Sequence, residues 1–279
     1  MAATAATEKQ QTLVIRPPSG FGLALGELWR FRELLLFLTW RDIKIRYKQT
    51  LLGAAWALLQ PFLTMIVFTV VINHIGRIHT SIPYPLFALS TLALWYYFSN
   101  SVNLTSASLV GSAALITKVY FPRISVVLSP ILAGLVDYCL AFCLVAGTMA
   151  YYGFGPPLQA LFVPLFVVLA GVMALGLGLV LSALNVSYRD IRYAVPFVLQ
   201  LWLWATPVAY PTGVVPAKFE LLYTLNPMTG VVEGYRWALL GTGHVRALHL
   251  AISIGTALVL LVAGSLYFSR AERVFADVV

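Results

Sequence analysis

The sequence predicts an all-α, polytopic membrane protein with six transmembrane helices. Of its 279 residues, 60% are hydrophobic, and only 18 are basic and 10 acidic, whereas about a quarter of an average soluble protein is charged. Residues 78–117 and 138–188 contain no charged side chain, and about 20 apolar residues suffice for one helical crossing. The chain lacks the roughly ten-residue alternating segments of a transmembrane β-barrel. We therefore expect helical crossings, some of them paired within one uncharged stretch.

The first fifty residues are expected to stay outside the bilayer. No cleavable signal is visible, because the first apolar run, 34–38, is too short. We expect 1–26 to be a flexible cytoplasmic segment and 27–50 to form an amphipathic helix on the membrane surface. In that helix Arg41, Lys44 and Lys48 share one face, and Trp40, Ile43 and Tyr47 share another. The helix either only anchors the protein in the headgroup region or also meets a cytoplasmic partner.

A single transmembrane domain is predicted at 51–270. Pro196 and Pro207 are expected to kink or unwind its fifth crossing. Between crossings five and six, the Gly- and Pro-rich segment 211–247 is expected to form short gate helices that dip back into the outer leaflet. A cytoplasmic tail follows at 271–279. The crossings are predicted at 51–72, 86–110, 126–150, 161–185, 194–210 and 248–269.

The distribution of basic residues predicts the orientation. Fourteen of the 18 Lys and Arg residues lie before the first crossing, in the second-to-third and fourth-to-fifth loops, or in the tail. The opposite loops contain the remaining Arg77, Lys218, Arg236 and Arg246. Because basic residues are enriched in cytoplasmic loops, both termini are expected in the cytoplasm.

The residues do not indicate an enzyme. No phosphate-binding G-x-x-x-x-G-K-[ST] motif occurs, and the four histidines are expected to be polar residues near the outer surface, so no catalytic or metal-binding residue is predicted. Asp137 is the one ionisable residue well inside a crossing, with no obvious cationic partner. We expect it to accept hydrogen bonds near the Tyr138 hydroxyl or from another helix. A lone buried charge argues against an ion-coupled lipid or drug transporter, the alternative from another class.

Two short cytoplasmic loops combine aromatic and charged residues. Residues 117–123 place two aromatic side chains between two cations, and 185–192 combine tyrosine, arginine and aspartate. Tyr, Phe and Arg are favoured at protein interfaces, so these loops are candidate contacts for a cytoplasmic partner. Alternatively, they are ordinary basic loops with interfacial aromatic residues.

Five segments of the chain form a distinctive series: Arg41–Pro61, Lys118–Arg123, Tyr188–Arg192, Ala205–Pro211 and Leu225–Gly230. Together they resemble type-2 ABC exporter permeases for polysaccharides and polyol phosphates, with the O-antigen exporters as the nearest resemblance. The resemblance runs in order from about residue 27 to 273. It implies a lipid-linked polysaccharide cargo, with teichoic-acid or capsule polymers as the alternative.

The resemblance further implies a homodimer in a bacterial inner membrane, served by two separate ABC ATPase subunits. ATP and Mg would bind to those partners, this chain would bind no cofactor, and no nucleic acid would be involved. The expected contacts for ATP-driven closure lie in the surface helix and the two loops. They are Arg41, Asp42, Lys118, Tyr120, Phe121, Pro122, Arg123, Tyr188, Arg189 and Asp190.

The resemblance also implies that the first and fifth crossings line the substrate path. Five aromatic residues lie there: Trp56, Phe62, Trp202, Trp204 and Tyr210. Aromatic faces pack against the C–H faces of sugar rings, and Tyr and Trp also offer a hydrogen-bond donor. For each of these residues, a lipid-facing or packing role is the alternative.

The lipid carrier of such a polymer ends in a pyrophosphate. Clustered cations recognise phosphate groups well. We therefore expect the undecaprenyl pyrophosphate end to be captured at the cytoplasmic edge by Arg41, Lys44 or Lys48.

Overall fold

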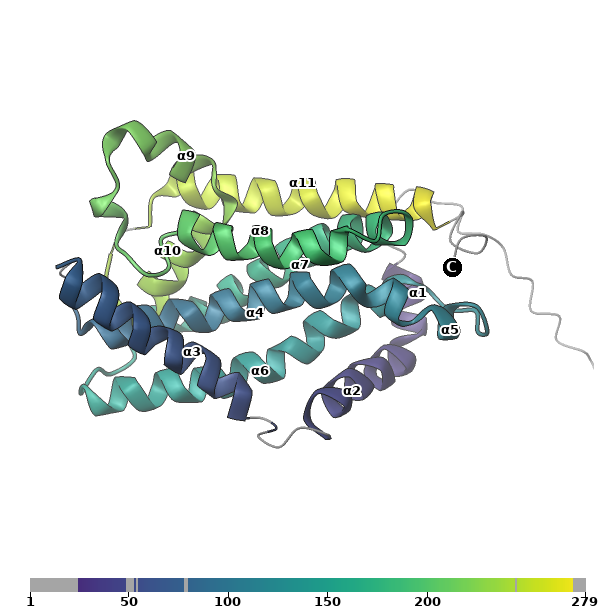
Figure 1. The fold of residues 1–279 in the computed structure, drawn as a ribbon, viewed down its shortest axis with the longest axis horizontal. Helices are drawn as coiled ribbons and strands as arrows, with labels where there is room; N and C mark the ends of the chain where they lie inside the picture. Colours follow the sequence, from purple (N-terminus) through teal and green to yellow (C-terminus); the bar gives the residue numbers. More distant parts are fainter. Residues whose placement is uncertain (1–24, 49–52, 54, 78–79, 244, 273–279) are drawn as a thin grey trace, which may run out of the picture.

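A computed structural model describes residues 25–48, 53, 55–77, 80–243 and 245–272. The regular structure of these ranges is helical, with no strand among them (Figure 1). The expectations for 1–24 and for the tail after residue 272 lie outside the described residues. The helices are α1 (Leu25–Arg30), α2 (Arg32–Lys48), α3 (Ala55–Phe68), α4 (Tyr84–Gly111), α5 (Ala113–Ile116), α6 (Ile124–Tyr151), α7 (Val163–Ser187), α8 (Ile191–Ala205), α9 (Glu220–Leu225), α10 (Pro227–Leu240) and α11 (Ala247–Ala271), with a π-helix η1 (Thr69–Ile75) and 3-10 helices η2 (Leu158–Phe162), η3 (Thr212–Val214) and η4 (Ala217–Phe219).

Among the described residues, four helical segments are long and apolar enough to cross a membrane. They are 55–72, 124–151, 158–187 and 247–271, which correspond to predicted crossings one, three, four and six. The helix at the predicted second crossing, α4, is equally long but more polar. The helix at the fifth, α8, has only 15 residues. The structure therefore confirms a polytopic helical membrane protein.

The polar character of α4 follows from its central position. It packs against α3, α6, α7, α8 and α10, so most of its surface is covered by protein rather than by lipid. Several of its buried hydroxyl groups donate to carbonyls of the preceding turn, as Thr105 does to the Ser101 carbonyl at 2.7 Å. A helix covered in this way does not need the hydropathy of one that faces lipid.

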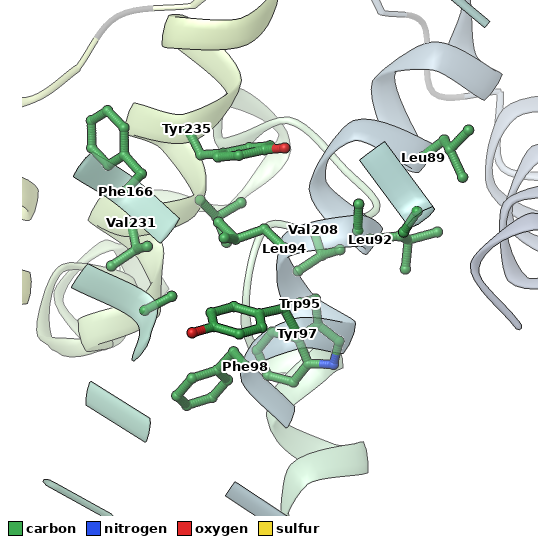
Figure 2. Packing of buried hydrophobic residues seen from close by; sticks show 14 of the residues in the cluster. Leu89, Leu92, Leu94, Trp95, Tyr97, Phe98, Phe166, Val208, Val231 and Tyr235 are labelled. Atoms are coloured by element: carbon green, nitrogen blue, oxygen red, sulfur yellow. The ribbon is translucent and has the colours of Figure 1, made fainter. Parts of the chain in front are cut away.

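Large side chains from α4 form the centre of the bundle. Figure 2 shows Trp95, Tyr97 and Phe98 of α4 packed among residues of other elements, including Val231 and Tyr235 of α10. The α10 helix is almost entirely buried. The segment 211–247, expected to form short gate helices, contains the short helices α9 and α10.

Small residues allow α7 and α11 to approach closely. A Cβ atom added at Gly264 of α11 would lie 2.5 Å from the carbonyl oxygen of Gly176 in α7, and one at Gly176 would lie 2.7 Å from the backbone of Leu260. Helices in membranes commonly pack through such small residues, because the backbones can then make extensive van der Waals contact. The Gly176–Gly264 contact therefore determines how closely these two helices pack.

Replacing Gly264 by Ala should lower the melting temperature of the purified protein. The added methyl group meets backbone, which cannot move aside as a side chain can, and overpacking of this kind costs about 1–3 kcal/mol. Gly255→Ala on the same helix is the matched control, because nothing lies within 4 Å of its added Cβ and Ala favours helix by about 0.5–1 kcal/mol. Thermal unfolding in detergent measures both. Equal melting temperatures would contradict the proposed tight contact.

Candidate functional site

The predicted cytoplasmic segments meet at one end of the bundle, which we call the basic end (α1, residues 117–123, residues 188–190 and the end of α11). Leu28 of α1, Ile116 of α5 and Phe268 of α11 belong to one apolar cluster there. The Arg123 guanidinium donates to the Glu272 carbonyl at 2.6 Å and lies 3.7 Å from its carboxylate. Burial raises the pKa of the Glu272 carboxyl group, and Arg123 offsets part of this effect. The first basic loop is thus tied to the end of the last helix.

The residues of the first loop divide into two groups. Phe121 is only 4% exposed and packs with Leu38 of α2 and Val126 of α6, and Pro122 is half-buried. Lys118 is exposed, and Tyr120 is 53% exposed. Phe121 is therefore placed to join the loop to α2, and Lys118 and Tyr120 are placed to meet another molecule.

The second loop projects from the basic end. Tyr188 is 64% exposed, and Arg189 and Asp190 are exposed as well. A tight turn presents them, because the Ile191 amide donates to the Tyr188 carbonyl at 3.2 Å. All three predicted contact residues of this loop are available at the surface of the chain.

The predicted surface helix, α2, is docked on α6 through polar contacts. Asp42 accepts a hydrogen bond from Ser129 of α6 at 2.6 Å and from its neighbour Arg41 at 2.8 Å. Lys44 and Lys48 remain exposed. Asp42 thus holds α2 and Arg41 in place, while the two lysines are accessible.

Asp137 has the cationic partner that sequence analysis did not find. Arg46 and the Tyr47 hydroxyl, both on α2, donate to its carboxylate. The expectation that Asp137 has a partner on another helix is confirmed. The Tyr138 hydroxyl is not among its hydrogen-bond partners. That hydroxyl pairs instead with Tyr235 of α10 at 2.9 Å.

The two-faced interpretation of α2 is wrong in one respect. Tyr47, assigned to the apolar face together with Trp40, turns inward to Asp137, while Trp40 is exposed. Arg46, four residues after Asp42, follows the same helical face towards α6. This i, i+4 pair of polar residues was the signal in the sequence for an inward polar stripe.

The predicted path residues are placed differently from one another. Trp56, Phe62 and Trp204 have exposed side chains. Trp202 is half-buried, donates to Asn226 at 2.9 Å and packs edge-on against Phe98. Its position favours a packing role.

Tyr210 and the C-terminal ends of α3 and α8 lie close to segment 211–247. The Tyr210 hydroxyl pairs with the hydroxyl of Tyr223 in α9. It also donates to the Trp204 carbonyl at 2.7 Å. The rings of Phe68 and Trp204 are 5.3 Å apart, so α3 and α8 converge there.

A buried arginine supports the point where α8 ends. Arg236 of α10 is 6% exposed and donates to the carbonyls of Pro207 at 2.6 Å and Val208 at 3.2 Å. Tyr84 donates to the next carbonyl, that of Ala209, at 2.6 Å. Arg236, counted from the sequence among the cations of the opposite loops, is instead buried within α10. Arg236 lies three residues after Glu233 in an otherwise apolar helix, and this spacing was the signal in the sequence for its burial.

A second buried pair joins α10 to α11. His249 Nδ1 lies 2.7 Å from Glu233 Oε2, and its other ring nitrogen is 3.2 Å from the Thr224 hydroxyl. Both side chains of the pair are nearly inaccessible. The interpretation of His249 as an interfacial surface residue is therefore wrong, and the pair holds α10 against α11.

The long apolar helices, the buried polar contacts and the basic end define a helical integral membrane protein. Residues 33–240 match the ABC-2 type transporter family, and the chain belongs to this family. It is 31% identical over 254 residues to the O-antigen export system permease protein RfbA of Myxococcus xanthus, a match that covers 90% of this chain and 97% of the relative.

Two further relatives match over similar lengths. An O-antigen export system permease protein RfbA of Klebsiella pneumoniae is 26% identical, with 88% of this chain and 95% of the relative covered. The polysialic acid transport protein KpsM of Escherichia coli is 22% identical, with 85% and 93% covered.

Breaking the contact between Arg46 and Asp137 should destabilise the docking of α2. Asp137→Asn leaves a partly buried guanidinium without its counter-charge, at a cost of about 1–3 kcal/mol. The double variant Arg46→Gln/Asp137→Asn removes both charges and should recover most of the loss. Melting temperatures in detergent measure the difference.

Glu33→Gln is the matched control for this cycle, because Glu33 is an exposed acid on the same helix and should have no effect. The cycle also includes the single variant Arg46→Gln. If the stability lost in the double variant equalled the sum of the losses in the two single variants, the two residues would not be coupled.

Proposed function

We propose that this chain is the transmembrane permease subunit of an ATP-driven exporter for a lipid-linked, O-antigen-like polysaccharide. The observation that carries the proposal is its similarity, over nearly its full length, to permeases named for O-antigen export. The lower identity to the polysialic acid transport protein favours an O-antigen-like cargo over a capsule polymer. The sequence contains no phosphate-binding loop, which supports a separate ATPase subunit that binds ATP and Mg.

The proposed topology has six crossings, with α4 and α8 as the second and fifth. Fifteen helical residues extend about 22 Å, which is short of the roughly 30 Å hydrocarbon core. The chain after α8 completes the crossing without helical hydrogen bonds, and Arg236 and Tyr84 satisfy its carbonyls. Non-helical backbone is tolerated at such depth only where protein covers it.

Six crossings put both termini on the same side of the membrane. We assign the basic end to the cytoplasm of a bacterium and the protein to its inner membrane, following the distribution of Lys and Arg. The burial of Arg236 supports this orientation, since it removes one cation from the opposite surface and leaves Arg77, Lys218 and Arg246 there.

In this proposal two ATPase subunits bind at the basic end of a homodimer. The exposed residues Lys118, Tyr120, Tyr188, Arg189 and Asp190 contact them. A second group of residues transmits the ATP-driven movement of the first basic loop to α2, α6 and the end of α11. This group contains Arg41, Asp42, Phe121, Pro122 and Arg123.

The substrate path lies between the two copies. Exposed aromatic residues of α3 and α8 line it, namely Trp56, Phe62 and Trp204, while Trp202 and Tyr210 hold the wall and the outer gate helices.

The lipid end of the substrate is captured on α2. Lys44 and Lys48 are exposed and Arg41 is partly exposed, so all three can meet the undecaprenyl pyrophosphate at the cytoplasmic edge of the bilayer.

Export should require the ATPase subunit. In vesicles loaded with lipid-linked polysaccharide from the source organism, the permease together with its ATPase and ATP should move polymer across the bilayer. The permease alone should not, because it has no site for ATP. Accessibility of the polymer to an added glycosidase measures transport. Transport by the permease alone would refute the proposed function.

The double variant Tyr120→Ala/Tyr188→Ala should weaken ATPase binding at least tenfold. Both rings are exposed at the basic end, and buried tyrosines are frequent hot spots at interfaces. Tyr151→Ala is the control, because Tyr151 is 83% exposed at the opposite end. Co-purification of the ATPase measures the effect. Equal recovery with both variants would show that the loops are not the contact.

A further inference from the structure

A cavity of about 330 Å³ lies beside the contact between Arg46 and Asp137. It is lined by the end of α2, the loop residue Gly53, the first half of α3 and the middle parts of α4 and α6. Its volume is at the lower end of the range for small-molecule sites, about 300–1,000 Å³. The residues that define its chemistry are Arg46, Trp56, Gln60, Asn100, Asn103 and Asp137.

Three amide side chains line this cavity without protein partners. Those of Gln60, Asn100 and Asn103 make no hydrogen bond within the part of the chain that the structure describes. Polar groups inside a membrane protein are costly unless they are satisfied. Elsewhere in α4 the buried hydroxyls of Ser90, Thr105 and Ser106 donate to carbonyls of the preceding turn. These amides are therefore available to a molecule in the cavity.

The charges of the cavity wall compensate each other. Among the described lining residues, Arg46 and Asp137 are the charged ones, and they are bound to one another. A phosphate group would have to compete with Asp137 for Arg46. An amide, in contrast, offers both donors and an acceptor, which suits hydroxyl groups, since these also donate and accept. The wall thus favours a neutral, hydroxyl-rich ligand over an anion.

Aromatic rings complete the wall. Trp56 is 51% exposed and lies at the cavity. The Tyr96 hydroxyl is engaged with Thr64 of α3 at 2.7 Å, so its ring is held as part of the wall. Aromatic faces beside hydrogen-bonding amides match the alternating C–H faces and hydroxyls of a sugar.

We infer that this cavity binds a neutral sugar unit of the exported polymer. The inference rests on the proposed function and adds a site within each protomer. Trp56 belongs both to the cavity and to the proposed path between protomers, so the cavity is a side pocket of that path. A sugar held there retains the polymer while the ATPase subunits reset.

The test uses the complete permease–ATPase complex in nanodiscs without ATP. The probe is a mixture of two- to six-sugar fragments released by mild acid from the surface polysaccharide of the source organism. Calorimetry should detect binding to the native complex and at least tenfold weaker binding to Asn100→Ala/Asn103→Ala. Gln60→Ala changes an exposed residue that does not support the fold, and it should also weaken binding. Gln159→Ala, an amide in η2 away from the cavity, should bind as the native complex does.

Inorganic pyrophosphate is the competing probe. It should not displace the sugar fragments, and displacement would show an anion site and overturn the inference. Native affinity in both cavity variants would also overturn it, while ATP-dependent transport by the native complex would leave the proposed function intact. Failure of the native complex to transport the polymer would instead count against the proposed function.

Discussion

Polar groups removed from water must find partners inside the protein, and this constraint shapes the half of the bundle that lies away from the basic end. The 15-residue helix α8 is too short to cross a bilayer. The carbonyls of Pro207, Val208 and Ala209, which follow it, would be unsatisfied in lipid. Arg236 of α10 and Tyr84 and Thr91 of α4 donate to them. The pair of Glu233 and His249 then holds α10 against α11. The central helix α4 and the buried helix α10 thus supply the donors for these carbonyls.

The same constraint connects the two ends of the molecule. Asp137 of α6 is satisfied by Arg46 and Tyr47 of α2, and the next residue, Tyr138, pairs with Tyr235 of α10. Phe121 packs against α2 as well. The first basic loop, α2, α6 and α10 therefore form a continuous set of direct contacts. In the proposed exporter, the ATPase displaces the loop. This displacement is transmitted through these contacting elements before it reaches the substrate path.

Exceptions to the constraint are informative. Most buried polar groups of α4 bond to their own helix, but Asn100 and Asn103 do not, and with Gln60 they face a cavity next to a neutralised ion pair. Lys44 and Lys48, in contrast, remain exposed on α2. The two chemistries suit the two parts of a lipid-linked polysaccharide. Exposed cations match a pyrophosphate, and uncompensated amides beside aromatic rings match a sugar.

The class of protein, the four most apolar crossings and the family were predictable from the sequence, because composition, uncharged length and the order of short motifs are local properties. The exposure of Tyr188 and Arg189 followed from the same reasoning. The tertiary structure alone revealed the partner of Asp137, the inward position of Phe121, and the burial of Arg236 and His249. The residues of these contacts are far apart in the chain, 91 positions in the case of Arg46 and Asp137. Whether a polar side chain meets lipid, water or a partner depends on which helices pack together, and hydropathy does not encode that packing.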